Sequence, residues 1–196
     1  MRLLLLIGVV VALFSSCSKT DEFGSRFLVD PEFESIARIQ KGSKWVYANS
    51  DSTLFDTVTL TNVQYNVNRV LSDDVESIQS VTMDFVSSIR GNITWVGEAQ
   101  AAGKSHTLVR EISKNGDYEL FFTQLDVGSQ VDNLMMDFKS ENLQVNKRVF
   151  KDVRGFRQVA DPQGRNYVYF SPNLGVLQRR INGTVWMYYE FIPFNE

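Results

Sequence analysis

The chain has 196 residues and is poor in the side chains that build crosslinks and metal sites. With a single cysteine, Cys17, internal disulfides and Cys-rich metal sites are unavailable, so the fold must rely on packing alone. A single histidine, His106, cannot build a zinc site with several imidazole ligands, and no G-x-S-x-G sequence supplies it with a nucleophile. No calcium loop of the D-x-[DN]-x-[DN]-G type occurs. We therefore expect no metal and no other cofactor, and a surface position for His106.

Charge and hydropathy exclude two further classes. The net charge is −3 and no block of Lys or Arg occurs, which argues against a nucleic-acid partner. The hydrophobic content of 43% and the charged content of 22% are ordinary for a globular domain, so the chain is not wholly disordered. After the N-terminal region no second long apolar run follows, so we expect a body that does not cross a membrane.

The first 17 residues have the organisation of an export signal. Arg2 supplies a positive charge, residues 3–14 form an apolar run interrupted only by Gly8, and two serines precede Cys17. The run is too short to span a ~30 Å hydrocarbon core, which needs about twenty residues. The alternatives are an ordinary secretory signal with an incidental cysteine and a short uncleaved anchor.

The sequence Phe14-Ser15-Ser16-Cys17 resembles the lipobox of bacterial lipoproteins, in the form that Bacteroidota tolerate, with Phe14 where Leu, Val or Ile is usual. The resemblance implies that the chain is cut before Cys17, that the Cys17 sulfur carries diacylglycerol, and that its new amino group is acylated. Residues 1–16 would then be a signal peptide, and the remaining 180 residues would be attached to the outer membrane.

Residues 17–30 are expected to hold the lipidated cysteine and a flexible linker. Within it Lys19, Asp21 and Glu22 resemble the export signal of surface lipoproteins in Bacteroidota, with Thr20 interrupting the pattern. This resemblance implies display at the cell surface, although the periplasmic face of the outer membrane stays an alternative.

Residues 31–196 predict one antiparallel β domain without internal repeats. Polar and apolar residues alternate in segments 56–60, 64–68 and 81–85, the period of a half-buried strand, and residues 44–48 and 93–96 are rich in β-branched and aromatic residues. The expected class is all-β, mainly an antiparallel meander, as a curved sheet, a half-barrel or a sandwich.

Turn residues predict how these strands connect. Asn182-Gly183 predicts a two-residue hairpin that pairs residues 175–181 with 184–192 and places Ile181 opposite Thr184. Asn115-Gly116 is expected to join residues 106–114 to 117–124 in the same way. Two more turns are expected, at Arg90-Gly91-Asn92 and at Asp161-Pro162-Gln163-Gly164.

One short helix is expected over Pro31 to Ile39, with Asp30 as its N-cap. Phe33, Ile36 and Ala37 fall on one face, so the helix should cap one end of the sheet. Residues 131–138 fit a helical turn or a strand.

Two short motifs in the body are similar to uncharacterised lipoproteins of Bacteroidota. Gly42-Ser43-Lys44-Trp45-Val46-Tyr47 resembles their G-x-x-W-x-Y opening strand, and residues 169–177, ending in Gly175-Val176-Leu177, resemble a strand near their C-terminus. The resemblance implies a curved antiparallel sheet or half-barrel, and it implies no activity.

Catalytic motifs are scarce. Ala102-Gly103-Lys104-Ser105 resembles the end of a P-loop, but Glu98 occupies the place of its first glycine, so we interpret this segment as a hairpin turn. A glycan hydrolase with two carboxylates stays an alternative, since such a mechanism requires only two acids at ~5–10 Å. The acids considered for that role are Asp73, Asp74, Asp84, Glu98, Glu111, Asp117, Glu119, Asp126 and Asp137.

We expect the large aromatic side chains to lie in the hydrophobic core. The alternative is that they form a platform for a sugar or line a pocket for an apolar ligand. This applies to Trp45, Trp95 and Trp186 and to the tyrosines of two adjacent strands, Tyr167, Tyr169, Tyr188 and Tyr189. The segment 186–192 has large apolar groups on both faces, so we expect it to be buried on both sides or to line a cavity.

Two tripeptides, Asp51-Ser52-Thr53 and Asp56-Thr57-Val58, resemble the O-glycosylation signal of Bacteroidota. Ser52 and Thr57 are therefore candidate glycan acceptors, the alternative being an unmodified turn residue and an unmodified strand residue. The expected function is that of a non-catalytic, lipid-anchored envelope protein that binds a glycan, a lipid or a partner protein. A carboxylate-pair glycan hydrolase and a purely structural envelope lipoprotein are the alternatives.

Overall fold

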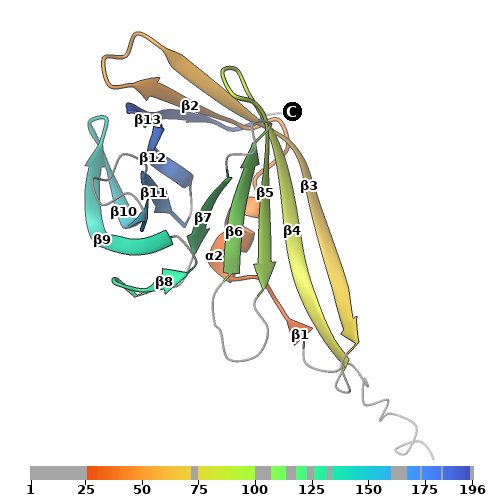
Figure 1. Cartoon of the computed structure of the whole chain (residues 1–196). Helices are drawn as coiled ribbons and strands as arrows, with labels where there is room; N and C mark the ends of the chain where they lie inside the picture. Colours follow the sequence, from red (N-terminus) through yellow and green to blue (C-terminus); the bar gives the residue numbers. More distant parts are fainter. Residues whose placement is uncertain are drawn as a thin grey trace, which may run out of the picture.

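The computed structural model describes residues 26–71, 75–99, 107–113, 118–122, 126–131, 134–159, 167–172, 174–181 and 183–194. Over this part the chain is mostly antiparallel strand with a single short helix, and its sheet curls into a half-barrel (Figure 1). The sheet has 13 strands in the order β7-β6-β5-β4-β3-β2-β13-β12-β11-β10-β9-β8, and β1 pairs with β4 off this path. The predicted all-β class is confirmed, and the half-barrel is the one of the expected architectures that forms.

The strands follow one another along the chain and pair mostly with their neighbours in sequence. Their bounds are β1 Arg26–Phe27, β2 Lys44–Asn49, β3 Phe55–Leu71, β4 Val75–Ser87, β5 Gly91–Ala99, β6 Thr107–Ser113, β7 Tyr118–Phe122, β8 Gln130–Val131, β9 Leu134–Val145, β10 Arg148–Gln158, β11 Tyr167–Ser171, β12 Gly175–Ile181 and β13 Thr184–Ile192. The helix α2 spans Pro31–Ala37.

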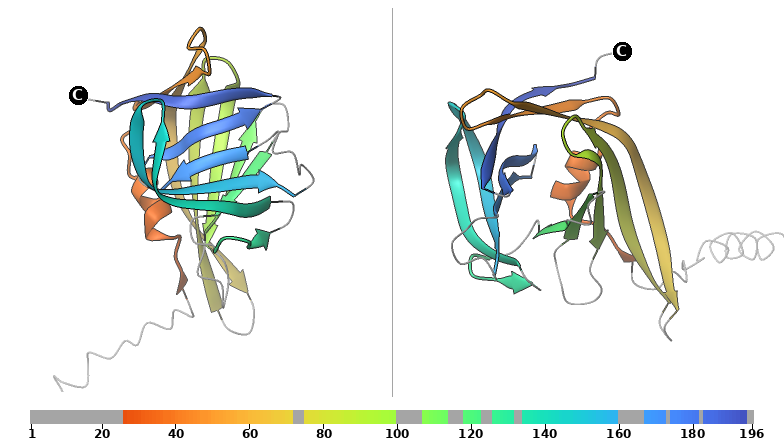
Figure 2. Two further views of the ribbon diagram at one scale, coloured as in Figure 1. Left: turned by 90° about the vertical axis from the view of Figure 1, so that its left-hand side faces the viewer. Right: turned by 45° about the horizontal axis from the view of Figure 1, so that its top comes forward.

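Two meanders make up the half-barrel, and the pairing of β2 with β13 joins them. Strands β2 to β7 form one and β8 to β13 the other, and the two face each other across the curl (Figure 2). At the join Tyr47 lies opposite Tyr188 and Trp45 opposite Phe191. The pairing of β2 with the last strand, β13, thus makes the two meanders one continuous sheet.

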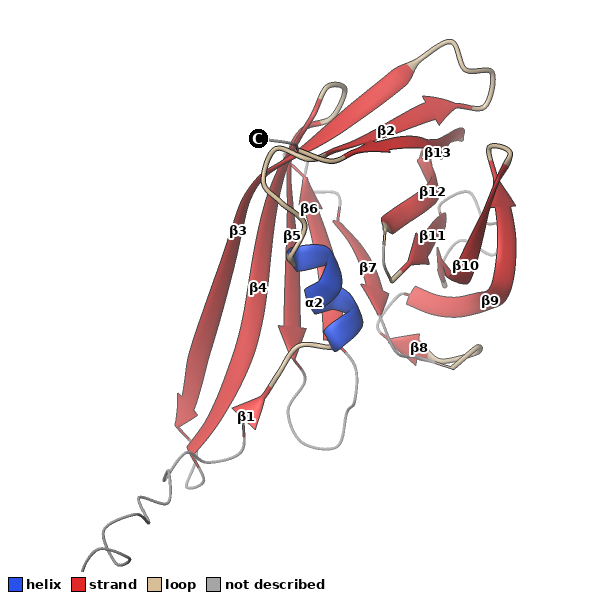
Figure 3. Ribbon diagram, turned by 180° about the vertical axis from the view of Figure 1, so that it is seen from behind, coloured by secondary structure: helices blue, strands red, loops and turns tan. Residues whose placement is uncertain are grey.

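Helix α2 lies inside the curl, which Figure 3 shows from behind. It begins as predicted, because the Asp30 carboxylate accepts a hydrogen bond from the backbone N–H of Glu32 at 2.7 Å. Its face of Phe33, Ile36 and Ala37 is buried, as expected. The Phe33 ring lies directly over Gly97 of β5, and Glu32 forms an ion pair with Arg154 of β10 at 2.8 Å. The helix therefore contacts both meanders, at one end of the curled sheet (Figure 2).

The core occupies the inner face of the curled sheet. Inward residues alternate along each strand, for example Val81, Met83 and Phe85 on β4 and Ile93 and Trp95 on β5, all buried. The outer face has no second layer among the described residues. Side chains on it are therefore half-buried by their neighbours or exposed.

The hairpin at Asn182-Gly183 has the predicted register. Ile181 lies opposite Thr184, and Gly183 has a φ of +84°, the left-handed conformation that such a turn requires. For β6 and β7 the antiparallel pairing is confirmed, but Ile112 lies opposite Tyr118. The expected register, which would place Ile112 opposite Glu119, is therefore wrong by one position, and the turn at 115–116 itself lies outside the described residues.

Three expectations need correction. Strand β13 is not buried on both faces, because the outer face is uncovered and Tyr189 is 43% exposed. Residues 26–30, assigned to the linker, belong to the fold, since β1 pairs with β4 and Val29 is buried. The two predicted strand segments 56–60 and 64–68 belong to one strand, β3, with a register shift after Leu60.

The ambiguous segment 131–138 lies in strands β8 and β9. Several other predictions fall outside the described residues: lipidation at Cys17, the turns at 102–105 and 161–164, and the surface position of His106. No helix of the described part is long and apolar enough to cross a membrane.

Replacing Gly183 with valine is expected to lower the free energy of unfolding by about 1–2 kcal/mol, because a Cβ at positive φ is strained and a β-branched one more so. No atom lies near enough to add a steric clash, so the loss would come from the backbone alone. Urea denaturation measures it. Thr184→Val, which places the same side chain on the neighbouring exposed strand position, should change stability by less than about 0.5 kcal/mol. Equal losses in both variants would contradict the turn assignment.

Candidate functional site

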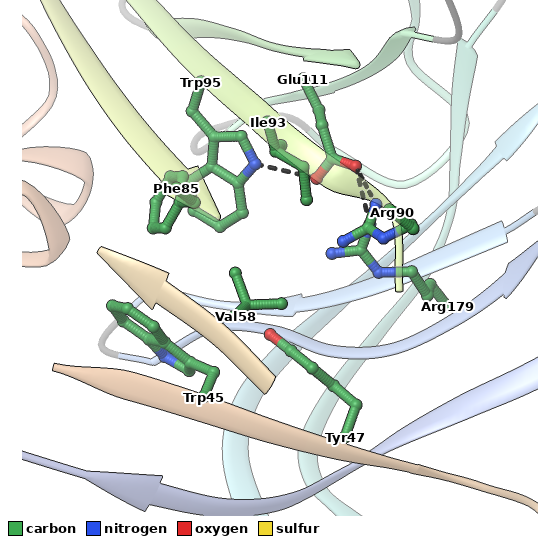
Figure 4. A pocket seen from close by; sticks show the side chains of 9 residues that line it. All are labelled: Trp45, Tyr47, Val58, Phe85, Arg90, Ile93, Trp95, Glu111 and Arg179. Carbon is green, nitrogen blue, oxygen red and sulfur yellow. Dashed lines mark hydrogen bonds and ion pairs between the residues drawn. The ribbon is translucent and has the colours of Figure 1, made fainter. Parts of the chain in front are cut away.

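Several polar side chains contact Glu111, whose carboxylate is buried inside the half-barrel (Figure 4). Its Oε1 atom accepts from Arg90 Nη1 at 2.6 Å and from Arg179 Nη1 at 2.7 Å. Its Oε2 atom accepts from Trp95 Nε1 at 2.8 Å. Both oxygens of the one carboxylate are thus held by charged or polar donors, as the burial of a charge requires.

Four separate elements supply these groups, and Trp95 lies on β5. Glu111 follows Thr107 and Val109 on the inward phase of β6, Arg179 lies on β12, and Arg90 lies in the turn between β4 and β5. Strands β6 and β12 are far apart in the order of the sheet. Only the curl of the sheet brings the carboxylate and the Arg179 guanidinium together.

A second carboxylate balances the charge of this cluster. Asp56 of β3 is buried, and its Oδ2 atom lies 3.6 Å from Arg90 Nε. The other oxygen of Asp56 accepts a hydrogen bond from the Ser87 hydroxyl at 2.6 Å. Two guanidinium groups and two carboxylates therefore face one another, and we call Asp56, Arg90, Glu111 and Arg179 the inner ion network.

The inner ion network keeps Glu111 ionised. Burial alone would raise the pKa of Glu111, but the positive charges of Arg179 and Arg90, with hydrogen bonds from Trp95 and Arg179, lower that pKa to about 2. A carboxylate with so low a pKa and both oxygens occupied is a poor general acid, since general acids work best with a pKa near the working pH.

Tyr47 lies beside the network as a neutral group. Burial raises the pKa of Tyr47 to about 12, against the opposing effect of Arg179 and Arg90. Its hydroxyl donates to the carbonyl of Val176 at 3.0 Å, and the Arg179 guanidinium lies 5.7 Å from the centre of its ring. The Trp45 indole similarly donates to the carbonyl of Leu174 at 2.9 Å, so β2 is tied to the start of β12.

The space within this cluster is small. The void measures about 10 Å³, which holds about one water molecule, whereas pockets for small ligands measure ~300–1,000 Å³. Its lining consists of Trp45, Tyr47, Val58, Phe85, Arg90, Ile93, Trp95, Glu111 and Arg179. The site as folded links β6 to β12 through the Glu111–Arg179 ion pair and leaves space for about one water molecule.

The Glu111 carboxylate gives a pH prediction. Its pKa is lower in the folded chain than the ordinary 4.5, so its stabilising effect is present above pH ~4.5 and is lost as the pH falls towards 2. The shift corresponds to a loss of up to about 3 kcal/mol. Urea unfolding of the wild type and of Glu111→Gln across this range should give a shallower pH dependence for the variant. Parallel curves would contradict the assigned pKa shift.

A different set of side chains lies on the outer face. Phe138 of β9 and Tyr169 of β11 meet over Gly155 of β10, where a Cβ would lie 2.9 Å from Phe138 and 3.0 Å from Tyr169. Tyr169 also packs on Tyr167, with ring centres 4.9 Å apart and planes tilted by 31°. Phe138 packs on Tyr169 in a similar way, with ring centres 5.5 Å apart and planes tilted by 30°. Their flat faces are used by one another, so they do not form the open row of rings on which a sugar stacks.

A second outer cluster is more exposed. Phe55 at the start of β3 and Tyr189 of β13 meet edge to face with ring centres 5.4 Å apart. Phe55 is 46% exposed, Tyr189 is 43% exposed, and the preceding Leu54 is 55% exposed. We call Leu54, Phe55 and Tyr189 the outer aromatic patch.

The remaining candidate acids do not form a shared site among the described residues. Asp84 accepts from Thr94 at 2.9 Å on the outer side of β4, and Asp137 pairs with Arg157 at 2.9 Å. Asp126 is exposed and Glu98 is half-buried. Asp73, Asp74 and Asp117, and the side chain of Glu119, lie outside the description. No group of three or more His, Cys, Asp or Glu that could hold a metal occurs in the described part.

The structure divides the candidate aromatic and glycan-acceptor residues by burial. Trp45 and Trp95 are core residues, as expected, while Trp186 is only half-buried. Ser52 is exposed in the loop after β2 with a φ of +57°, an accessible position for a glycan. Thr57 is half-buried within β3, where its backbone N–H donates to Ser88.

Sequence reasoning missed most of the inner ion network. Glu111 is one of nine acids considered as catalytic, Arg90 and Asp56 are named only as parts of a turn and of a glycosylation tripeptide, and Arg179 is not named at all. Searches of protein-family models, of curated proteins and of solved structures found no match for this chain. Function is therefore inferred from the residues and surfaces of the chain itself.

Proposed function

We propose that this protein is a non-catalytic, lipid-anchored module of the outer envelope that binds a partner protein through the outer aromatic patch. The lipid anchor rests on the lipobox-like sequence ending at Cys17. The export signal before it and the absence of other thiols agree with that role for the cysteine. The resemblance of Lys19, Asp21 and Glu22 to a surface export signal favours the outside of the outer membrane.

The observation that carries the binding role is the contact of the exposed rings of Phe55 and Tyr189, with the exposed Leu54 next to Phe55 in sequence. Large apolar groups that lie together on a surface commonly mark a protein interface, and aromatic residues are enriched at such interfaces. These three residues have no structural task inside the half-barrel, since the core lies on the opposite face of the sheet.

A protein partner fits the geometry better than a glycan or a lipid does. A lipid carrier would need an apolar cavity, and the inner face is filled by α2 and the core. A glycan platform would need open ring faces, and Phe138, Tyr169 and Tyr167 turn theirs towards one another. An apolar patch on a convex surface favours burial against another protein.

The non-catalytic role is supported by the state of the buried acids. Glu111 is ionised and saturated by three donors, and Asp56 is held by Arg90 and Ser87. Neither carboxylate has a free oxygen facing a space large enough for a sugar. The glycan hydrolase therefore has no support from the described residues.

Replacing Cys17 with serine is expected to abolish lipid attachment and release the protein from the membrane fraction. Mass spectrometry of the native protein should find diacylglyceryl cysteine as the first residue, and Ser16→Ala, which keeps a small residue before the cleavage point, should behave as wild type. A Cys17→Ser variant that is processed normally and stays with membranes would show the lipoprotein assignment to be wrong. The same mass tests Ser52 and Thr57, because a mass equal to sequence plus lipid excludes glycans on both.

The partner is tested by a photo-crosslinking amino acid placed at Tyr189 in the anchored protein. We expect a single adduct of defined mass from intact cells, which disappears when Phe55→Ser is added. The same crosslinker at Val149, an exposed residue of β10, serves as the matched control. Identical adducts at both positions, or none at Tyr189, would contradict this use of the outer aromatic patch.

A further inference from the structure

Strand β1 fixes the direction from which the chain enters the body. It pairs with β4 in parallel, with Arg26 opposite Ser77 and Phe27 opposite Ile78. Since β4 begins at Val75, the end of β1 nearer the N-terminus points towards the turn between β3 and β4 (Figure 1). An antiparallel β1 would send the preceding residues to the other end of the molecule.

The segment after β1 is fastened at several points, so this entry position is part of the fold. The Val29 N–H donates to the Gln79 side chain at 3.1 Å, and the Asp30 N–H donates to the Thr107 hydroxyl at 2.5 Å. Glu32 forms an ion pair with Arg154 on the other side of the curl. The first residues of the body are thereby attached to β4, β6 and β10.

The hairpin of β3 and β4 projects beyond the rest of the sheet at this end. Strand β3 pairs with β2 only from Phe55 to Thr59, and β4 pairs with β5 only from Ser80 onwards, yet the two pair with each other as far as Leu71 and Val75. Val67, 51% exposed, lies on this projection, opposite Gln79. The outer aromatic patch and the last described residue, Phe194, lie at the opposite end.

The linker is too short to reverse this arrangement. Eight residues separate Cys17 from Arg26, and even a fully extended chain of that length spans only about 30 Å. Leu54 directly precedes β3, and Val67 lies thirteen positions further along, a path of at most about 40 Å that bends near the register shift after Leu60 (Figure 2). A lipid on Cys17 would therefore hold the Val67 end of the molecule nearer the bilayer than the Leu54 end.

We infer that the projecting β3–β4 hairpin is the membrane-facing end of this protein, and that it holds the outer aromatic patch away from the lipid surface. The inference rests on the proposed lipid anchor at Cys17. Asp73 and Asp74, between the two strands in sequence, carry negative charge, so the hairpin faces the polar headgroups and does not enter the hydrocarbon. The partner that we infer for this end is the headgroup layer of the bilayer.

Energy transfer from single labelled sites to the membrane tests this orientation. In the mature protein the Cys17 sulfur would be occupied by lipid, so Val67→Cys and Leu54→Cys each provide one reactive thiol at positions of similar exposure. Each variant, made with its own leader in a bacterium that matures lipoproteins, is labelled with a donor dye and reconstituted into phosphatidylcholine vesicles. The vesicles contain a small fraction of acceptor-labelled phosphatidylethanolamine.

Transfer from position 67 should exceed that from position 54 at least about twofold, because Val67 lies on the projecting hairpin and Leu54 lies before the other end of β3. Inserting a long Gly/Ser segment after Ser25 should reduce this difference, since a flexible linker lets the body turn. Equal transfer at the two positions, or greater transfer at 54, in protein of lipidated mass overturns the orientation alone. Protein that lacks the lipid mass and does not bind vesicles overturns the proposed anchor and the inference together.

Discussion

Replacing Arg179 with methionine is expected to lower the free energy of unfolding by about 3–5 kcal/mol, as measured by urea denaturation at pH 7. Methionine keeps most of the side-chain volume but removes the guanidinium that lies 2.7 Å from Glu111. The carboxylate would remain buried, with Arg90 and Trp95 as its remaining donors among the described residues. This loss measures the cost of leaving the buried Glu111 carboxylate without one of its positive partners. It does not measure the net contribution of the ion pair to stability.

The chain supplies a matched control in Arg157, which pairs with Asp137 at 2.9 Å on the outer face. The same substitution there, Arg157→Met, removes an ion pair that is partly exposed to water, and such pairs contribute at most about 1 kcal/mol. If both variants lost a similar free energy of unfolding, burial of the Arg179–Glu111 ion pair would not explain the loss at Arg179. The two variants lose one arginine each, so changes in net charge cancel in the comparison.

A double-mutant cycle separates the network from the individual residues. Glu111→Gln removes the buried charge while retaining a side chain that can accept hydrogen bonds. In that background Arg179→Met should cost clearly less than it does in the wild type, because no full negative charge is left behind. Additive losses would mean that Arg179 stabilises the fold through packing against Tyr47 and its other neighbours, and that Glu111 does not depend on it.

Local patterns predicted the parts of the fold that local chemistry determines. The Asp30-Pro31 start of α2 follows from capping, and the register of β12 against β13 follows from the turn at Asn182-Gly183. The turn at Asn146-Lys147 was missed. Both of its residues have positive φ and Val145 lies opposite Arg148, but without a glycine the sequence carries a weaker turn signal.

The inner ion network depends on the curl of the sheet, which no local pattern encodes. Glu111 and Arg179 are 68 positions apart and meet only because β6 and β12 face each other. A usable signal was nevertheless present. Glu111 lies in phase with Thr107 and Val109, and Arg179 in phase with Leu177, so each strand places a charge where the core is expected. Two inward charges of opposite sign predict a buried pair.

The aromatic residues were harder to place because the sheet is covered on only one side. The sequence 186–192 is apolar on both faces, which predicts burial on both faces, yet Tyr189 remains exposed. Burial depends on whether a second layer covers a strand, and an aromatic pattern by itself does not show that. The same ambiguity is informative, since apolar residues without a covering layer are candidates for binding a partner.

Replacing Gly97 with alanine is expected to lower the free energy of unfolding by about 4 kcal/mol, more than the usual 1–3 kcal/mol for an added methyl group in a core. A Cβ at this position would lie 2.0 Å from the Phe33 ring, so the two groups cannot both keep their places. Phe33 is completely buried, and α2 is attached on its other side to Arg154. The ring has little room to move, and the helix would have to shift as a whole.

The cause of that loss can be isolated by removing the ring. Phe33→Ala alone should cost about 3–5 kcal/mol through the cavity that it leaves beneath α2. In that background Gly97→Ala should cost almost nothing, because the added methyl group enters the vacated space. Denaturation of the two single variants and the double variant measures the coupling. A full additional loss in the double variant would mean that Gly97 is required for the conformation of β5, and that the contact with Phe33 does not explain why glycine occupies this position.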